Sequence, residues 1–129
     1  MDPQRPRTLV IGAGAGIGSA TQLVEQARAT TPWRPLVLLG SDTPFPFRPR
    51  PSVIVVPGIP TGVIACMPLL EEWGIASRLA STLDLPGCFE GAVTTLADVW
   101  LASLNDEELA QVEVFGSDEL ARRYGVPSL

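Results

Sequence analysis

Four glycines at every second position form the stretch of this chain best suited to chemistry. Residues 8–20 read Thr-Leu-Val-Ile-Gly-Ala-Gly-Ala-Gly-Ile-Gly-Ser-Ala, an apolar run that leads into glycines at 12, 14, 16 and 18. Apolar residues at helical spacing follow at once. Glycine lets the backbone turn tightly and approach a pyrophosphate, and a helix N-terminus offers free N–H groups to an anion. The stretch therefore predicts a strand, a glycine turn and a helix that together bind nucleotide phosphates.

The composition excludes several kinds of catalysis and of partner. All nine basic residues are arginine, so the chain has neither lysine nor histidine. That removes Schiff-base lysines, histidine bases, histidine metal ligands and Walker-type lysines. The net charge of −5 disfavours nucleic acids and anionic membranes, and no apolar run reaches the ~18 residues of a membrane span. We expect a cytoplasmic protein with no nucleic-acid or membrane partner.

The remaining reactive side chains give no catalytic or metal constellation. Cys66 and Cys88 are the only cysteines, and two thiols alone cannot complete a zinc or iron–sulfur site. We expect reduced, buried thiols, with a disulfide as the alternative. The acids Asp84, Glu90 and Asp98 are expected at the solvated surface. No catalytic residue and no metal ligand is predicted.

Apolar runs and turn signals alternate along the chain in the order of an α/β domain. We predict a proline-rich rigid loop at 42–51 and one further helical turn within 105–111. Strands are expected at 9–13, 35–40, 52–56, 77–83 and 112–115, and helices at 18–29, 63–73, 92–104 and 117–124. This order predicts a single three-layer domain over residues 1–129, with a mostly parallel five-stranded, Rossmann-like sheet.

The glycine pattern by itself leaves four interpretations open. Glycines 12, 16 and 18 fit the turn of short-chain dehydrogenases, but that family's Tyr-x-x-x-Lys pair is absent: position 128 after Tyr124 is serine. The dinucleotide pattern G-x-G-x-x-G places Ile17 or Ser19 at its third glycine. Residues 14–20 also match the glycine turn of the ferredoxin–NADP reductase superfamily. In the fourth interpretation, small residues only allow a helix to pack closely on a sheet.

Motifs along most of the chain favour the reductase interpretation. In order and spacing they resemble the nucleotide-binding region of dihydroorotate dehydrogenase electron-transfer subunits, over about residues 5 to 129. The motifs lie at 36–41, 44–51, 56–60, 67–75, 77–81, 86–91 and 120–127. The resemblance implies an NAD-domain fold of the ferredoxin reductase type. It also implies electron transfer in pyrimidine biosynthesis, between a nicotinamide nucleotide, FAD and a [2Fe-2S] cluster.

The chain departs from this family at both ends. The FAD-binding barrel would precede residue 8, and the cluster cysteines would follow the nucleotide domain. A Cys-Gly-Pro segment is expected after the last strand, but here Gly116 is followed directly by Ser117-Asp-Glu. We therefore expect a shortened nucleotide-binding domain that holds no flavin or cluster of its own. It would bind NAD(H) weakly and would not be a complete, redox-active enzyme alone.

The resemblance implies a set of cofactor-binding residues. Gly14, Gly16, Ile17 and Gly18 match the phosphate turn. Ser41 and Asp42 end the second strand, where family members contact the adenosine ribose. A carboxylate there would accept hydrogen bonds from the ribose hydroxyls and would repel a 2′-phosphate, so it would favour NAD over NADP. The alternative is that Asp42 is an ordinary acidic residue of an exposed loop. Gly116 follows the last strand and is expected to face the same crevice.

A nucleotide domain without its flavin barrel would expose a former interface. We therefore expect either a homodimer or a complex with a flavoprotein subunit. The alternative function is a non-catalytic remnant of the fold that acts through protein–protein contacts.

Overall fold

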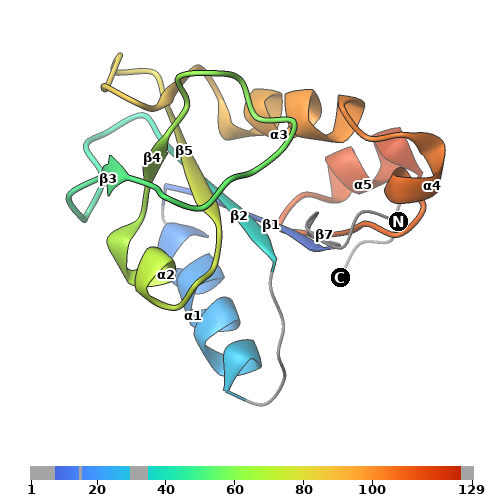
Figure 1. The fold of residues 1–129 in the computed structure, drawn as a ribbon, viewed down its shortest axis with the longest axis horizontal. Coiled ribbons are helices and arrows are strands. Elements are labelled where there is room, and N and C mark those ends of the chain that lie inside the picture. The colour runs from blue at the N-terminus through green and yellow to red at the C-terminus, as the bar shows by residue number, and fades with distance from the viewer. Residues whose placement is uncertain (1–7, 15, 30–34, 126–129) are drawn as a thin grey trace.

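In the computed structural model, the described residues are 8–14, 16–29 and 35–125. They form a five-stranded, all-parallel sheet in the order β6–β5–β2–β1–β7, with helices on both faces (Figure 1). The sheet strands are β1 (Thr8–Ala13), β2 (Leu36–Ser41), β5 (Ser77–Ser81), β6 (Phe89–Glu90) and β7 (Glu113–Phe115). The helices are α1 (Gly16–Arg28), α2 (Pro68–Glu72), α3 (Val93–Ala102), α4 (Asp106–Leu109) and α5 (Asp118–Tyr124). The predicted α/β class and five-stranded parallel sheet are confirmed.

Alternating residues of the central strands fill two separate cores. On β2, Leu36 and Leu38 face the layer of α3 and α5, and Val37 and Leu39 face the layer of α1 and α2 (Figure 1). All four are completely buried. A strand covered on both faces is a continuous apolar run, which is why residues 36–39 show no polar alternation.

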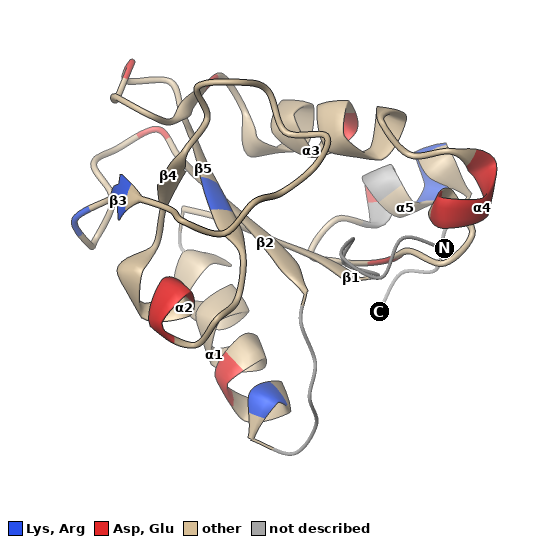
Figure 2. Cartoon of the chain, viewed as in Figure 1, with Lys and Arg blue, Asp and Glu red and all other residues tan. Residues whose placement is uncertain are grey.

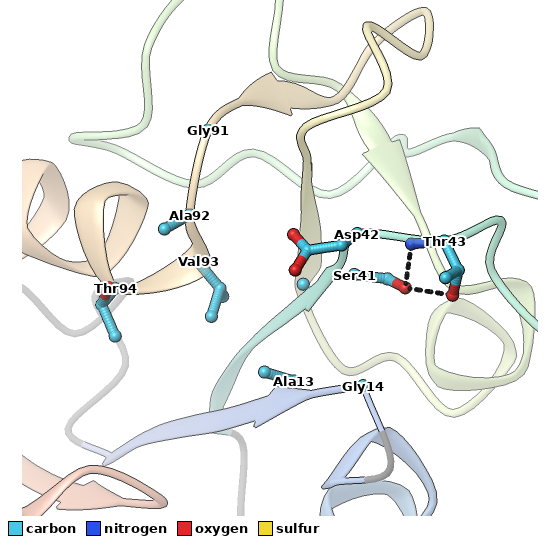
Figure 3. Close-up of a pocket in the computed structure, with 10 residues that line it drawn as sticks. Ala13, Gly14, Ser41, Asp42, Thr43, Gly91, Ala92, Val93 and Thr94 are labelled. Carbon is cyan, nitrogen blue, oxygen red and sulfur yellow. Dashed lines mark hydrogen bonds between the residues drawn. The ribbon is translucent and has the colours of Figure 1, made fainter.

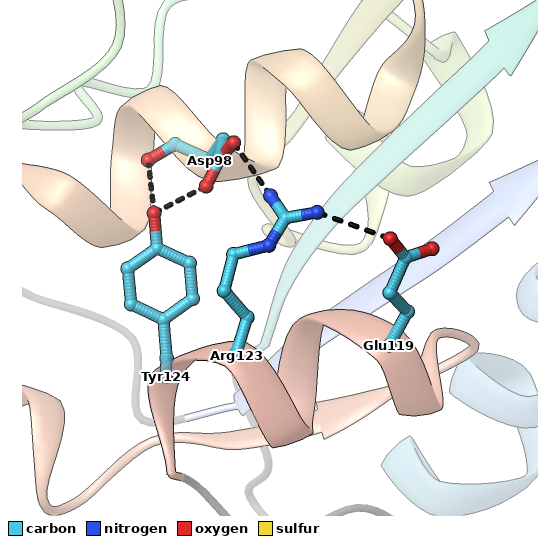
Figure 4. Close-up of polar contacts among 4 residues, drawn as sticks. All are labelled: Asp98, Glu119, Arg123 and Tyr124. Atoms are coloured by element: carbon cyan, nitrogen blue, oxygen red, sulfur yellow. Dashed lines mark hydrogen bonds and ion pairs between the residues drawn. The ribbon is translucent and has the colours of Figure 1, made fainter.

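Helix α5 is attached to α3 by a small polar cluster (Figure 4). The Tyr124 hydroxyl donates to the carboxylate of Asp98 and to its backbone oxygen, the latter at 3.2 Å. Arg123 pairs with Asp98 at 2.8 Å and with Glu119 at 3.1 Å. The cluster joins two helices, so we interpret it as structural.

Helix α2 is shorter than the predicted helix over 63–73. It begins at Pro68, where the missing proline N–H is harmless, and it is followed by Gly74 at a φ of 74°. Residues 65–66 belong instead to β4 (Ala65–Cys66), which pairs antiparallel with β3 (Arg50–Pro51). The two form a separate ribbon beside the main sheet.

The predicted strand at 52–56 is wrong. Residues 52–64, which we call the arch, run from β3 to β4 without regular structure and cover the α3 face of the sheet (Figure 1). The inward Ile54 and Val56 pack on the core below, and the outward Val53 and Val55 are 89% and 83% exposed. The fifth sheet strand is β6, which lies between the predicted strand at 77–83 and the predicted helix at 92–104. Inward and outward side chains alternate in residues 53–56 because one side of an extended segment is buried. The alternation does not come from pairing with a strand of the sheet.

Candidate functional site

The carboxyl ends of β1 and β2 meet the beginning of α3 around an open cavity of about 450 Å³. This first cavity falls within the roughly 300–1,000 Å³ of small-molecule sites. Its lining comes from three places: the end of β1, the end of β2, and the turn that leads into α3. The lining residues are Ala13, Gly14, Gly40, Ser41, Asp42, Thr43, Gly91, Ala92, Val93 and Thr94.

Three neighbouring polar residues at the end of β2, Ser41, Asp42 and Thr43, line the first cavity (Figure 3). The Asp42 side chain points across the cavity toward Ala92 and Val93, and its carboxylate accepts a hydrogen bond from the Thr82 hydroxyl at 3.3 Å. The Ser41 hydroxyl turns the other way and lies 3.1 Å from both the hydroxyl and the N–H of Thr43. Asp42 is exposed, so its carboxylate keeps acceptor capacity for a ligand hydroxyl.

A second cavity of about 430 Å³ lies beside the first, between β1, α1 and β7. Ala13, at the end of β1, lines both cavities. The other residues lining the second cavity are Val10, Ile11, Gly12, Gly16, Ser19, Ala20, Leu23, Phe115 and Gly116. The strand order reverses here, because β2 lies on one side of β1 and the later β7 lies on the other. Ligands of open parallel sheets bind in the crevice at such a reversal.

The glycines between positions 12 and 18 are needed for different reasons. A Cβ atom on Gly12 would lie 2.8 Å from both the Ala20 Cβ and the Gly16 oxygen, so this glycine lets α1 approach β1. Gly14 has a φ of 55°, a backbone conformation that favours glycine. Gly16 and Gly18 have neither constraint, because their φ angles are ordinary and a Cβ on either would meet nothing within 4 Å. The packing explanation therefore accounts for Gly12 and not for Gly16 or Gly18.

The predicted cofactor residues divide between the two cavities. Gly14, Ser41 and Asp42 line the first, whereas Gly16 and Gly116 line the second. Gly116 also meets a structural need: its φ is 96°, and a Cβ there would collide with the Ile11 backbone oxygen.

Two predicted residues lie in neither cavity. Ile17 is 4% exposed in the core beneath α1, and its N–H donates to the Gly14 oxygen at 3.2 Å. Ile17 thus holds the glycine turn from inside and turns no polar side-chain atom toward a ligand. Gly18 is exposed one residue further along the helix.

Residues 91–94 were missed as part of the site. They line the first cavity because α3 packs very closely on β2: a Cβ on Gly40 would lie 2.6 Å from the Val93 Cβ. The available signal was Gly40 itself, a glycine inside an otherwise apolar strand, which indicates a close approach by another element. Ser19 and Phe115, which line the second cavity, were also missed.

The residues present suit a nucleotide better than a metal cluster. Two adjoining cavities, an open first helical turn and an exposed carboxylate fit the phosphates and ribose of a dinucleotide. Cys66 is buried, and its pKa is raised to about 11 by burial and by the neighbouring Glu71 carboxylate. Burial also raises the pKa of Cys88. Both are free thiols, and two cannot supply the four ligands of a [2Fe-2S] cluster.

Within the described residues, no group of three or more cysteine, aspartate and glutamate side chains is arranged to hold a metal ion. Among those same residues, no helix has both the length and the apolar character that crossing a bilayer requires. Comparison with models of known protein families, with curated proteins and with solved structures gave no match.

Proposed function

We propose that this chain binds NAD(H) across the carboxyl end of β1, with the adenosine half in the first cavity and the phosphates over the first turn of α1. One observation carries the proposal: Gly16 and Gly18 have open space above them and no internal reason to be glycine. Glycine inside a helix costs about 1 kcal/mol relative to alanine, so Gly18 weakens α1 without improving its packing; Gly16, the first residue of α1, does not improve its packing either. A ligand backbone or phosphate that must come close to the helix explains both.

The charge pattern of α1 supports an anionic ligand. The first turn of α1 contains no acidic residue, whereas that of α4 contains Asp106, Glu107 and Glu108. An acid in a first turn stabilises a helix through its dipole, but it would repel a phosphate. The first turn of α1 thus places no carboxylate of its own at the positive end of the helix.

Asp42 supports a ribose with a free 2′-hydroxyl. It follows β2 directly, and Figure 3 shows its carboxylate directed into the first cavity. A carboxylate there accepts hydrogen bonds from ribose hydroxyls and repels a 2′-phosphate. We therefore propose a preference for NAD(H) over NADP(H).

From the resemblance to dihydroorotate dehydrogenase electron-transfer subunits, we propose that the chain is the nucleotide-binding part of an electron-transfer system. NAD(H) supplies hydride chemistry when bound, and this chain's residues hold and orient it. On the same resemblance, we propose a flavoprotein subunit as the partner that would hold the flavin and the cluster.

The binding test is calorimetry with NADH and with ADP-ribose, using wild-type protein, Gly16→Glu and Gln22→Glu. A Cβ at position 16 meets nothing within 4 Å, and a carboxylate in the first turn favours the helix dipole, but its negative charge would repel the phosphates of the ligand. We expect heat of binding and a raised melting temperature for wild type, and neither for Gly16→Glu. Gln22→Glu adds the same charge to an exposed position outside both cavities and should bind as wild type does. No heat of binding and no rise in the melting temperature of the wild type at millimolar ligand would refute the proposal.

The specificity test compares NADH with NADPH on wild type and Asp42→Asn. We expect NADPH to bind wild type at least about tenfold more weakly, and the gap to narrow in Asp42→Asn, since the repulsion of the 2′-phosphate is removed. Glu25→Gln removes an exposed carboxylate of α1 that lines neither cavity, so it should keep the wild-type ratio. Equal binding of the two nucleotides by wild type would make Asp42 an ordinary loop acid.

A further inference from the structure

The arch is fixed to the molecule by polar groups that a surface loop does not normally have. The Glu71 carboxylate accepts hydrogen bonds from the Ser52 hydroxyl at 2.7 Å and from the Val53 N–H at 2.8 Å. From below, the guanidinium of Arg78 donates to the Ile54 backbone oxygen. Glu71 belongs to α2 and Arg78 to β5, and between them they hold the consecutive residues 52–54 of the arch.

These anchors are costly. Arg78 is only 5% exposed, its Nε atom has no hydrogen-bond partner, and desolvation lowers its pKa. Burial raises the pKa of Glu71, but the hydrogen bonds from the arch and the positive charge of Arg78 outweigh that effect and leave it lowered. Burying an arginine without a hydrogen-bonded carboxylate costs free energy. This cost in free energy fixes the conformation of a segment whose outward side chains, Val53 and Val55, are exposed to solvent.

A groove adjoins the arch where it joins the β3–β4 ribbon. It is lined by Pro49, Arg50, Pro51, Ile64, Ala65, Pro86 and Gly87, and Ile64 is 48% exposed. Val53 and Val55, two and four residues beyond Pro51 in the chain, are exposed apolar side chains as well. Large apolar side chains left exposed near a groove indicate an interaction site.

The backbone of the ribbon discourages strand addition. Pro51 has no N–H to offer a new neighbour, and Pro49 stands just before β3. A partner must therefore bind through side chains placed in the groove and against the valines. The fixed arch suits that mode, because a surface that is already ordered loses little entropy on binding.

The charges on this surface indicate the chemistry of the partner. Arg48 and Arg50 make no ion pair within the described chain, although the whole chain has a net charge of −5. Figure 2 shows basic residues at the β3 end of the molecule and an acidic cluster on α4 at the far end. A second copy could offer α4, but Leu109 of that helix packs into its own core, and Glu108 caps it. The acids of α4 therefore bring no free apolar side chain for the groove.

We propose that the arch surface (Arg48, Arg50, Val53, Val55 and Ile64) docks a short segment of another protein that combines apolar side chains with flanking carboxylates. The apolar side chains bury Val53, Val55 and Ile64. The carboxylates face Arg48 and Arg50. This surface does not include the residues of either cavity at the end of β1.

The probes are three synthetic peptides: one with two leucines flanked by glutamates, one with lysines in place of the glutamates, and one with serines in place of the leucines. Binding is followed by fluorescence anisotropy and by backbone amide shifts of the whole protein. We expect the glutamate–leucine peptide alone to bind, more weakly as salt rises, and to shift the amides of Val53, Val55 and Ile64.

Variants separate the apolar contribution from the charge. Val53→Ser/Val55→Ser should weaken binding at least about tenfold, since the few side chains that the partner buries carry most of the binding energy. Val99→Ser, which truncates an exposed valine of α3, should not. Arg48→Glu/Arg50→Glu should transfer the preference to the lysine peptide.

Three results would overturn the proposal. They are equal binding of the glutamate and lysine peptides, no binding at millimolar peptide, and amide shifts confined to another surface. Self-association of the protein alone that Val53→Ser/Val55→Ser abolishes would assign the surface to a second copy instead. None of these outcomes depends on nucleotide binding, so the two proposals stand or fall separately.

Discussion

Between positions 12 and 18, glycine meets three separate requirements. Gly12 gives α1 room against β1, Gly14 adopts a left-handed backbone, and Gly16 and Gly18 leave the surface of the first helical turn open. The sequence alone presents these residues as one regular pattern, and for that reason the glycines by themselves left more than one nucleotide family open. The atoms that an added Cβ would meet distinguish a glycine needed for packing from a glycine that leaves space for a ligand.

This division predicts opposite effects of alanine at two positions. Gly18→Ala should leave the free protein as stable as wild type or up to about 1 kcal/mol more stable, because the methyl group meets no atom and improves helix propensity. Gly12→Ala should destabilise it by about 1–3 kcal/mol, because the methyl group lies within 3 Å of α1. Urea unfolding of both variants measures the difference. A loss of stability in Gly18→Ala would show that this glycine has a structural role after all.

Among the elements, helices and buried strands were predictable and the arch was not. The apolar run of β2 and the helical spacing of α3 are local patterns, and both appear where they were expected. The arch depends on hydrogen bonds to residues far along the chain. Glu71 lies 18 residues after its partner Val53, and Arg78 lies 24 residues after its partner Ile54. No local pattern signals such bonds, so alternating apolar residues at 52–56 were mistaken for a strand. β6 was missed because two residues are too few to show a period.

Because Tyr124 attaches α5 to α3, we expect the free energy of unfolding to fall as the pH rises through the alkaline range. Burial, and then the hydrogen bond and charge of Asp98, raise the pKa of Tyr124 from 10 to about 12. The folded state therefore keeps the phenolic proton where the unfolded state loses it. Its contribution is complete below pH 10 and is lost as the pH rises toward about 12.

Tyr124→Phe tests this attachment. It removes the hydroxyl that donates to Asp98 and should cost about 1 kcal/mol at neutral pH. The difference in unfolding free energy between wild type and Tyr124→Phe should shrink as the pH passes 10, and urea titrations across that range measure it. A difference that stays constant to pH 12 would mean that the hydrogen bond does not persist in solution.

At the scale of the whole molecule, the sheet order accounts for the position of the candidate site. Parallel strands end at one edge, so Gly14, Ser41 and Asp42, which lie far apart in the chain, meet there. That meeting could be predicted from strand order alone. The wall formed by residues 91–94 could not, because it depends on how closely α3 settles on Gly40. The division of the glycine turn and Gly116 between two adjoining cavities likewise depends on the reversal of strand order at β1.

The arch also has a consequence for synthesis of the chain. Its anchors, Glu71 and Arg78, are made after it, so the run Val53-Ile-Val55-Val56 leaves the ribosome with nothing to hold it. An uncharged run of β-branched residues is prone to aggregate until the residues that anchor it have been synthesised. Prolines at 49, 51, 57 and 60 surround it on both sides. Proline interrupts intermolecular strand pairing, so these residues act as gatekeepers that protect the nascent chain until β5 and α2 have emerged.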